Sequence, residues 1–138
     1  MARADFVITL HGGDFDGNWQ RFEPGGTVSG TVQIVPDSDL RANHVWVRAQ
    51  WHTEGRGDRD EVRVAALDVF QGTLTAQTPV TFSFSFTLPG EPWSYAGHYI
   101  NILWEIVAEI DVPMAPDLRK SQLFILAPRS LVRPPGVA

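Results

Sequence analysis

The chain has 138 residues, no cysteine and a formal net charge of −5 at pH 7. This length corresponds to about one domain, which can bury enough surface to fold without a disulfide or a metal. The lack of cysteine excludes disulfide frameworks, cysteine-ligated zinc and thiol catalysis. The 11 Lys and Arg residues are scattered along the chain, whereas proteins that bind nucleic acid cluster such residues, so we expect no nucleic-acid partner.

Neither terminus nor interior predicts a membrane segment. No stretch approaches the roughly 20 apolar residues of a membrane span, and the opening MARADFVITL lacks the apolar core and cleavage site of a signal peptide. We therefore expect a soluble cytoplasmic protein. Paired prolines near the end favour extended backbone, so we expect a single domain over residues 1–128 and an extended tail over 129–138.

Alternation of apolar and polar residues with a period of two dominates the sequence. Such a period is typical of β-strands with one buried face. Segments rich in Gly, Pro, Asp and Asn separate the alternating runs and predict turns. In chain order, the expected strands cover residues 6–10, 27–35, 45–51, 62–69, 81–87, 100–110 and 118–126. Seven or eight strands predict an all-β fold, a two-sheet antiparallel immunoglobulin-like sandwich.

The alternation also predicts which side chains face the core. Those expected to point inward are Val45, Val47, Ala49, Trp51, Phe82, Phe84, Phe86, Ile100, Ile102, Trp104, Ile106, Ala108 and Ile110. Those expected to point outward include Trp46, Arg48, Gln50, His52, Ser83, Ser85, Glu105 and Glu109, which predicts a solvated face. Leu103 and Val107 are apolar on this outward side, so we expect a loop, an edge or a partner to cover part of the strand over 100–110.

The connection after the Phe-rich strand contains two prolines and two large aromatics. Pro89 and Pro92 must lie outside the strands, because proline cannot donate a hydrogen bond to a sheet. Trp93 and Tyr95 have two interpretations. They fold over the open end of the sandwich and cap the core, or they form an exposed aromatic platform for a ligand or partner. The sequence alone does not separate these interpretations.

Several segments resemble arrestin-like domains. Residues 22–34, FEPGGTVSGTVQI, resemble the aromatic-x-Pro-Gly-x-x-Val-x-Gly-x-Val opening of such domains. Residues 84–111, FSFTLPGEPWSYAGHYINILWEIVAEID, resemble the later stretch in which a Phe-rich strand ends in Leu-Pro and a linker leads into a long strand. Residues 108–126, AEIDVPMAPDLRKSQLFIL, look like the bacterial sporulation-control branch.

The resemblance implies an arrestin-type sandwich of the arrestin, retromer-subunit and sporulation-control group. Members of this group act as scaffolds and adaptors and do not catalyse reactions. They usually carry two sandwiches in tandem, whereas this chain has room for one. Properties that depend on an inter-domain cleft, and the receptor-phosphate sensor of true arrestins, are therefore not transferred to this chain.

Two short motifs partly match known functional sequences. Asp14, Asp16 and Asn18 have the alternate spacing of the first ligands in a calcium loop. However, the twelfth position is Gly25, where a bidentate Glu belongs, so a solvated turn is the better interpretation. The tetrapeptide Gly-Arg-Gly-Asp at 55–58 spells an integrin-binding sequence, yet its charged surroundings favour a solvated loop.

The remaining polar residues do not form a recognisable catalytic or metal-binding motif. The four histidines are His11, His44, His52 and His98. His44 and His52 are on the same face of one strand but about 26 Å apart at strand rise, too far for one metal. Glu105 and Glu109 are about 13 Å apart, longer than a paired-carboxylate hydrolase uses. We expect no catalytic residues, no metal and no cofactor.

Two functions remain open. The leading hypothesis is a non-enzymatic scaffold or adaptor that binds a protein partner or its own copies through sheet edges and loops, as part of a larger assembly. Trp46 motivates it, since this large apolar residue lies on the outward face and could select a strand added at an edge. The alternative is a carbohydrate- or small-ligand-binding sandwich that uses Trp93, Tyr95 and Trp19.

Overall fold

The computed structural model describes residues 3–55, 59–97 and 100–129. The strands are β1 (Ala4–His11), β2 (Asp14–Asp16), β3 (Trp19–Phe22), β4 (Thr27–Pro36), β5 (Leu40–Gly55), β6 (Glu61–Leu74), β7 (Val80–Thr87), β8 (Tyr95–Ala96), β9 (Ile100–Asp111) and β10 (Leu118–Leu126). Among the described residues, no helix is long and apolar enough to span a membrane.

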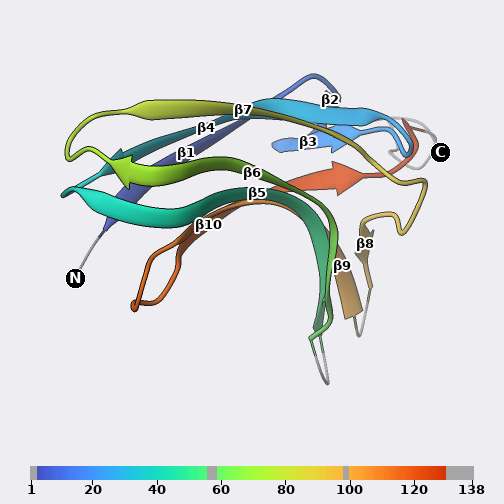
Figure 1. Cartoon of the computed structure of the whole chain (residues 1–138). Helices are drawn as coiled ribbons and strands as arrows, with labels where there is room; N and C mark the ends of the chain where they lie inside the picture. Colours follow the sequence, from blue (N-terminus) through green and yellow to red (C-terminus); the bar gives the residue numbers. More distant parts are fainter. Residues whose placement is uncertain (1–2, 56–58, 98–99, 130–138) are drawn as a thin grey trace.

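The strands form two sheets packed face to face (Figure 1). The smaller sheet has the order β1-β4-β7, and its strands are antiparallel. The larger sheet has seven strands, ordered β2-β3-β10-β9-β5-β6, with β8 paired to β9. Only the short β3–β10 contact is parallel among the described pairings. The predicted all-β sandwich is confirmed, and the short strands β2, β3 and β8 are additions to the expected set.

The core between the sheets contains most of the side chains that the alternation predicted to point inward. Val45, Val47, Trp104, Ile106 and Ile110 have no exposed surface. Phe84 and Phe86 are buried, and Phe82 packs against Phe70 with ring centroids 5.8 Å apart. Ile100 is different, because it is 45 % exposed. Ile102 is half-buried and does not pack against the core. Both residues were wrongly placed in the core, since β9 begins beyond the end of the smaller sheet.

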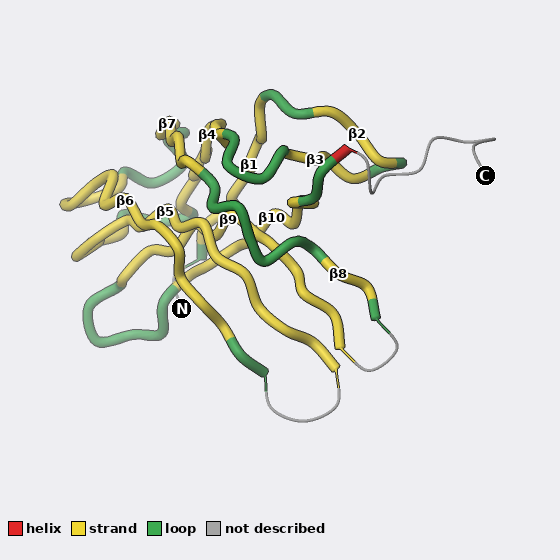
Figure 2. Tube along the Cα trace, turned by 90° about the vertical axis from the view of Figure 1, so that its right-hand side faces the viewer, coloured by secondary structure: helices red, strands yellow, loops and turns green. Residues whose placement is uncertain are grey.

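The larger sheet curls away from the smaller sheet at one end. Figure 1 shows β5, β6 and β9 bending at the end that carries β8, and Figure 2 shows β6, β5, β9 and β8 side by side there. The outer side of the sheet is therefore concave in this region. Since side chains on a concave face converge, those on the outer side of β5 and β9 crowd together.

This crowding buries polar residues that the alternation had predicted to be solvated. Arg48, Gln50, His52 and Glu105 are only 7 %, 1 %, 4 % and 3 % exposed. Arg48 forms an ion pair with Glu109, and His52 Nδ1 lies 3.2 Å from a carboxylate oxygen of Glu105. The expectation of a solvated outer face is thus wrong for β5 and β9. Val107 on the same side is 1 % exposed, so part of β9 is covered as expected. The expected loop, edge or partner is not needed to explain this, because the crowded side chains of the curled sheet account for it.

Candidate functional site: an apolar groove beside β8

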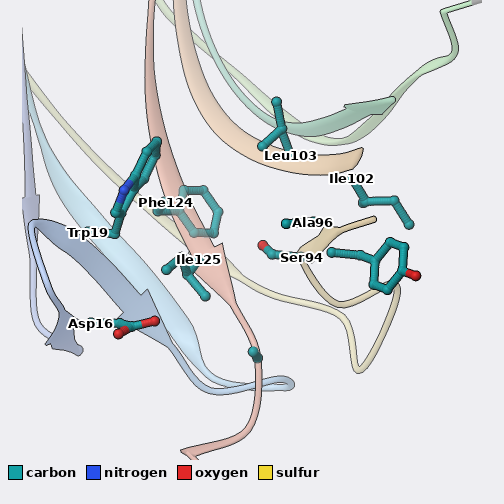
Figure 3. A pocket seen from close by; sticks show the side chains of 10 residues that line it. Asp16, Trp19, Ser94, Ala96, Ile102, Leu103, Phe124 and Ile125 are labelled. Atoms are coloured by element: carbon teal, nitrogen blue, oxygen red, sulfur yellow. The ribbon is translucent and has the colours of Figure 1, made fainter. Parts of the chain in front are cut away.

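An apolar groove of about 500 Å³ lies at the curled end of the larger sheet (Figure 3). It forms where β10 changes its neighbour. β10 pairs with β9 as far as Phe124 and then with β3 through Ile125 and Leu126, while β9 continues beside β8. In Figure 3, Phe124 and Ile125 lie between Trp19 on one side and Ala96 and Ile102 on the other. The lining residues are Asp16, Trp19, Ser94, Tyr95, Ala96, Ile102, Leu103, Phe124, Ile125 and Ala127.

The hairpin of β2 and β3 forms one wall. Asp16 pairs opposite Trp19 in this hairpin, so both side chains lie on the same side of it. The hairpin is fixed by Arg21, which is 4 % exposed and donates from Nη1 to the carbonyl of Ala127 at 2.6 Å. Arg21 also donates to both carboxylate oxygens of Asp14, from Nε at 2.7 Å and from Nη2 at 2.8 Å. This clamp ties the wall that carries Trp19 to the chain that leaves β10.

The segment that contains β8 forms the other wall. Ser94 bridges to β10, because its N–H donates to the carbonyl of Leu126 at 2.7 Å and its Oγ accepts from the N–H of Leu126 at 2.9 Å. Tyr95 then pairs opposite Ile102 of β9. A Cβ at Gly97 would lie 2.3 Å from Cε2 of Tyr95, so only glycine allows the ring to pack over this position. The Tyr95 ring is thereby held at the rim while 56 % exposed.

Two aspartates on the same side of β2 have different electrostatic surroundings. The Arg21 hydrogen bond holds the pKa of Asp14 below its usual value, and Arg129 adds to this effect by its charge. The pair also raises the pKa of Arg21. Asp16 lines the groove, and within the described part of the chain no ion pair or side-chain hydrogen bond involves it. Asp16 thus places a carboxylate that no described cation pairs with beside an apolar surface.

The lining of the groove suits apolar side chains. Its polar side-chain groups among the described residues are the Asp16 carboxylate, the Ser94 and Tyr95 hydroxyls and the Trp19 indole N–H, and Ser94 is already bonded to β10. None of the described histidines lines the groove. Across residues 3–55, 59–97 and 100–129, no group of three or more His, Cys, Asp or Glu side chains is placed to hold a metal ion. The arrangement can bury hydrophobic groups of a ligand and offers one negative charge to them.

The three predicted binding residues lie in different places. Trp46 is half-buried on the outer side of β5, where the His44 ring and the Arg48 guanidinium each lie 5.2 Å from its ring. Trp93 is 43 % exposed, donates from Nε1 to the carbonyl of Gly90 at 2.8 Å, and does not line the groove. Tyr95 does line it. The interpretation that Trp93 and Tyr95 cap the core is wrong, because both are exposed; their role in binding stays a prediction.

The other motifs have structural explanations or lie outside the described residues. The solvated turn holds only for Asn18, which lies in the tight turn at Gly17 (φ 63°). It is wrong for Asp14 and Asp16, which belong to strand β2, and Asp14 is paired with Arg21. His44 lies 2.7 Å from Asp68, and both are in the neighbourhood of Trp46. Residues 56–58 of the Gly-Arg-Gly-Asp sequence, and His98, lie outside the described residues.

Sequence reasoning identified only part of the groove. It singled out Tyr95 and Trp19 as aromatics in loops and Leu103 as an apolar residue on an outward face. It missed Phe124, Ile125 and the role of Asp16. The signal for Ile125 was present in the alternation, since β10 carries Leu123 and Ile125 on its outward side, the same irregularity that singled out Leu103.

Comparison with known proteins supports the fold. No known protein family matches the sequence, and no curated protein matches it. Among solved structures, the chain is similar to Spo0M, a sporulation control protein from Bacillus subtilis, with a TM-score of 0.65 and 16 % sequence identity. The fold is arrestin-like. The alignment covers 95 % of this chain but 51 % of Spo0M, so the chain spans about half the length of that protein. At this identity the likeness establishes the fold alone.

Proposed function

We propose that this domain is a non-enzymatic protein-binding scaffold that docks apolar side chains of a partner in the groove beside β8. One observation carries the proposal. Trp19 and Tyr95 are 45 % and 56 % exposed, and they border the same apolar groove from its two walls. Trp and Tyr are the residues that most often dominate binding energy in protein interfaces. Large exposed apolar groups that border one concavity are typical of an interaction site.

The arrangement of the walls supports a binding role. The Arg21 clamp and the Ser94 bridge hold both walls on β10 through hydrogen bonds of 2.6 to 2.9 Å. A preformed groove loses little conformational entropy when a partner binds, which favours affinity. The similar protein Spo0M is described as a sporulation control protein, and a regulatory task of that kind is compatible with a scaffold.

A carbohydrate or another small ligand is the second candidate, because aromatic rings on two walls could stack on a sugar ring. The small number of polar groups in the lining argues against a sugar ligand. A sugar carries many hydroxyls, each of which needs a hydrogen-bond partner when it is buried. Among the described residues, the side-chain partners in the groove are the Asp16 carboxylate, the Ser94 and Tyr95 hydroxyls and the Trp19 indole N–H, which are few for a sugar. An apolar segment of a protein therefore matches the lining better.

The test is selection of random-sequence peptides on the immobilised domain, with a glycan array probed in parallel. We expect peptides with bulky apolar residues to be enriched and Trp19→Ala or Tyr95→Ala to weaken their binding at least about tenfold. Phe15→Ala is the matched control, since Phe15 is 68 % exposed on the same hairpin but does not line the groove. Glycan binding that requires Trp19, without peptide binding, would support the second candidate. If peptide binding does not depend on Trp19 or Tyr95, the proposal is wrong.

A further inference from the structure

We infer that the groove takes an extended apolar segment of a partner that also carries a Lys or Arg, and that this cation pairs with Asp16. The inference rests on the proposed function and specifies the chemistry of the partner. It starts from the two aspartates of β2. Asp14 and Asp16 are two positions apart, so their side chains lie on the same side of the strand. Asp14 pairs with Arg21 and Arg129 of the same chain, whereas Asp16 pairs with no cation among the described residues.

Asp14 and Asp16 lie on the same side of one short strand but have different partners. Asp14 is held by Arg21 at 2.7 and 2.8 Å and by Arg129, and the carboxylate helps to fix the hairpin. Asp16 is exposed, lines the groove beside Trp19, and takes part in no such clamp within residues 3–55, 59–97 and 100–129. It therefore does not stabilise the wall by an ion pair of the described residues. The described residues thus leave its charge to a bound partner.

The geometry of the hairpin defines the spacing within the partner. Asp16 and Trp19 are cross-strand neighbours, whose Cβ atoms lie about 5 Å apart in such pairs. In an extended segment, residues i and i+2 point to the same side and are about 7 Å apart. A bulky apolar residue against Trp19 thus brings a basic residue two positions away within reach of Asp16. The same cation can also contact the face of the Trp19 ring.

Charge selects a foreign partner over a second copy of this chain. Two copies that dock groove to groove around a two-fold axis would bring their Asp16 carboxylates toward each other. Each copy also carries a formal net charge of −5, which opposes close approach. A basic, apolar segment avoids both penalties, and the net charge of the domain attracts it at long range.

The test uses a peptide selected on the wild-type domain, in which the Lys or Arg is then changed to Gln or Glu. We expect selected peptides to share a bulky residue and a base two positions apart. Asp16→Asn should weaken binding about two- to fivefold, as for an exposed ion pair, and raised salt should weaken binding to the wild type more than binding to Asp16→Asn. Asp16→Lys should weaken it further, and the peptide with Glu should regain affinity for this variant. Asp117→Asn, an exposed aspartate away from the groove, is the control.

The outcomes separate the inference from the proposed function. Peptides that require Trp19 but show no basic preference and bind Asp16→Asn as tightly as the wild type would overturn the inference and leave the proposed function standing. Binding that is indifferent to Trp19→Ala and Tyr95→Ala would overturn both. Light scattering gives a further check. Dimers of the wild-type domain that Trp19→Ala converts to monomers would show that a second copy occupies the groove, and the inference would be wrong.

Discussion

The outer side of β7 and the outer side of β5 and β9 follow the same alternating pattern, but they have different environments. On β7, the hydroxyl residues between the phenylalanines, such as Ser83 and Ser85, are exposed. On β5 and β9, the outward residues Arg48, His52 and Glu105 are buried. The inward residues of all three strands face the same core. The two regions therefore differ in the exposure of the side chains that point away from the core.

The difference shows that alternation predicts the direction of a side chain but not its burial. A strand in a three-stranded sheet with nothing above it leaves its outer side chains in water. Curled strands at the centre of a seven-stranded sheet press their outer side chains together. The charged residues on that concave side then need partners, because an unpaired buried charge is costly. The ion pair of Arg48 with Glu109 and the 3.2 Å contact between His52 Nδ1 and the Glu105 carboxylate meet this need.

The largest expected effect concerns the core that the two regions share. Trp104 has no exposed surface, and its Nε1 donates to the carbonyl of Pro92 at 2.8 Å. Trp104→Ala should lower the free energy of unfolding by about 3–5 kcal/mol, as large-to-small core substitutions do. Ser83→Ala, on the exposed side of β7, should change it by no more than about 0.5 kcal/mol. Denaturant titration followed by circular dichroism measures both values. Equal effects would contradict the assigned faces.

The second prediction tests the buried polar side directly. Arg48 and Glu109 have side-chain exposures of 9 % and 13 %. Arg48→Met removes the cation and leaves the carboxylate without its partner, so we expect a loss of about 1.5–3 kcal/mol in the free energy of unfolding. The double variant Arg48→Met with Glu109→Leu should recover most of this loss, since replacing both charges by apolar groups is often neutral.

A matched arginine on the same side gives the control. Arg63 lies on β6 opposite Gln50 and is exposed. Arg63→Met should therefore change stability by no more than about 0.5 kcal/mol. If Arg48→Met and Arg63→Met have the same small effect, the outer side of β5 is solvated in solution and the contrast with β7 disappears.

Much of the fold was predictable from the sequence because long strands repeat the alternation several times. β10 matches its predicted bounds, and β4 and β9 match within a residue. The strands β2, β3 and β8 were missed, because strands of two to four residues are too short to show a period. The curl of the larger sheet was also unpredictable, since it arises from packing between strands that are distant along the chain.

The groove was harder to predict than the fold for the same reason. Its lining comes from four separate segments, at residues 16–19, 94–96, 102–103 and 124–127. Single residues such as Trp19 and Tyr95 were noticeable as aromatics outside the core pattern. Their convergence depends on the point where β10 leaves β9 for β3, which is a pairing and not a sequence motif. In the sequence, Asp16 resembles an ordinary turn residue. Its position becomes notable only by contrast with Asp14, which is paired with Arg21 on the same side of β2.

The smallest expected effect concerns the ion pair of Arg21 and Asp14. One partner is buried and the other is partly exposed, so the pair is intermediate between the exposed side of β7 and the buried side of β5 and β9. Arg21 and Asp14 have side-chain exposures of 5 % and 28 %. Because folding lowers the pKa of Asp14 below 3.8, its contribution to stability is complete well above pH 3.8 and is lost as the pH falls through the lower folded value. The stability difference between wild type and Asp14→Asn, measured by denaturant titration, should therefore be constant near neutral pH and shrink in acid. Phe15→Ala changes no titrating group on the same hairpin. It should therefore change the free energy of unfolding equally at neutral pH and in acid. A difference for Asp14→Asn that does not depend on pH would mean that Arg21 does not clamp the hairpin through this carboxylate.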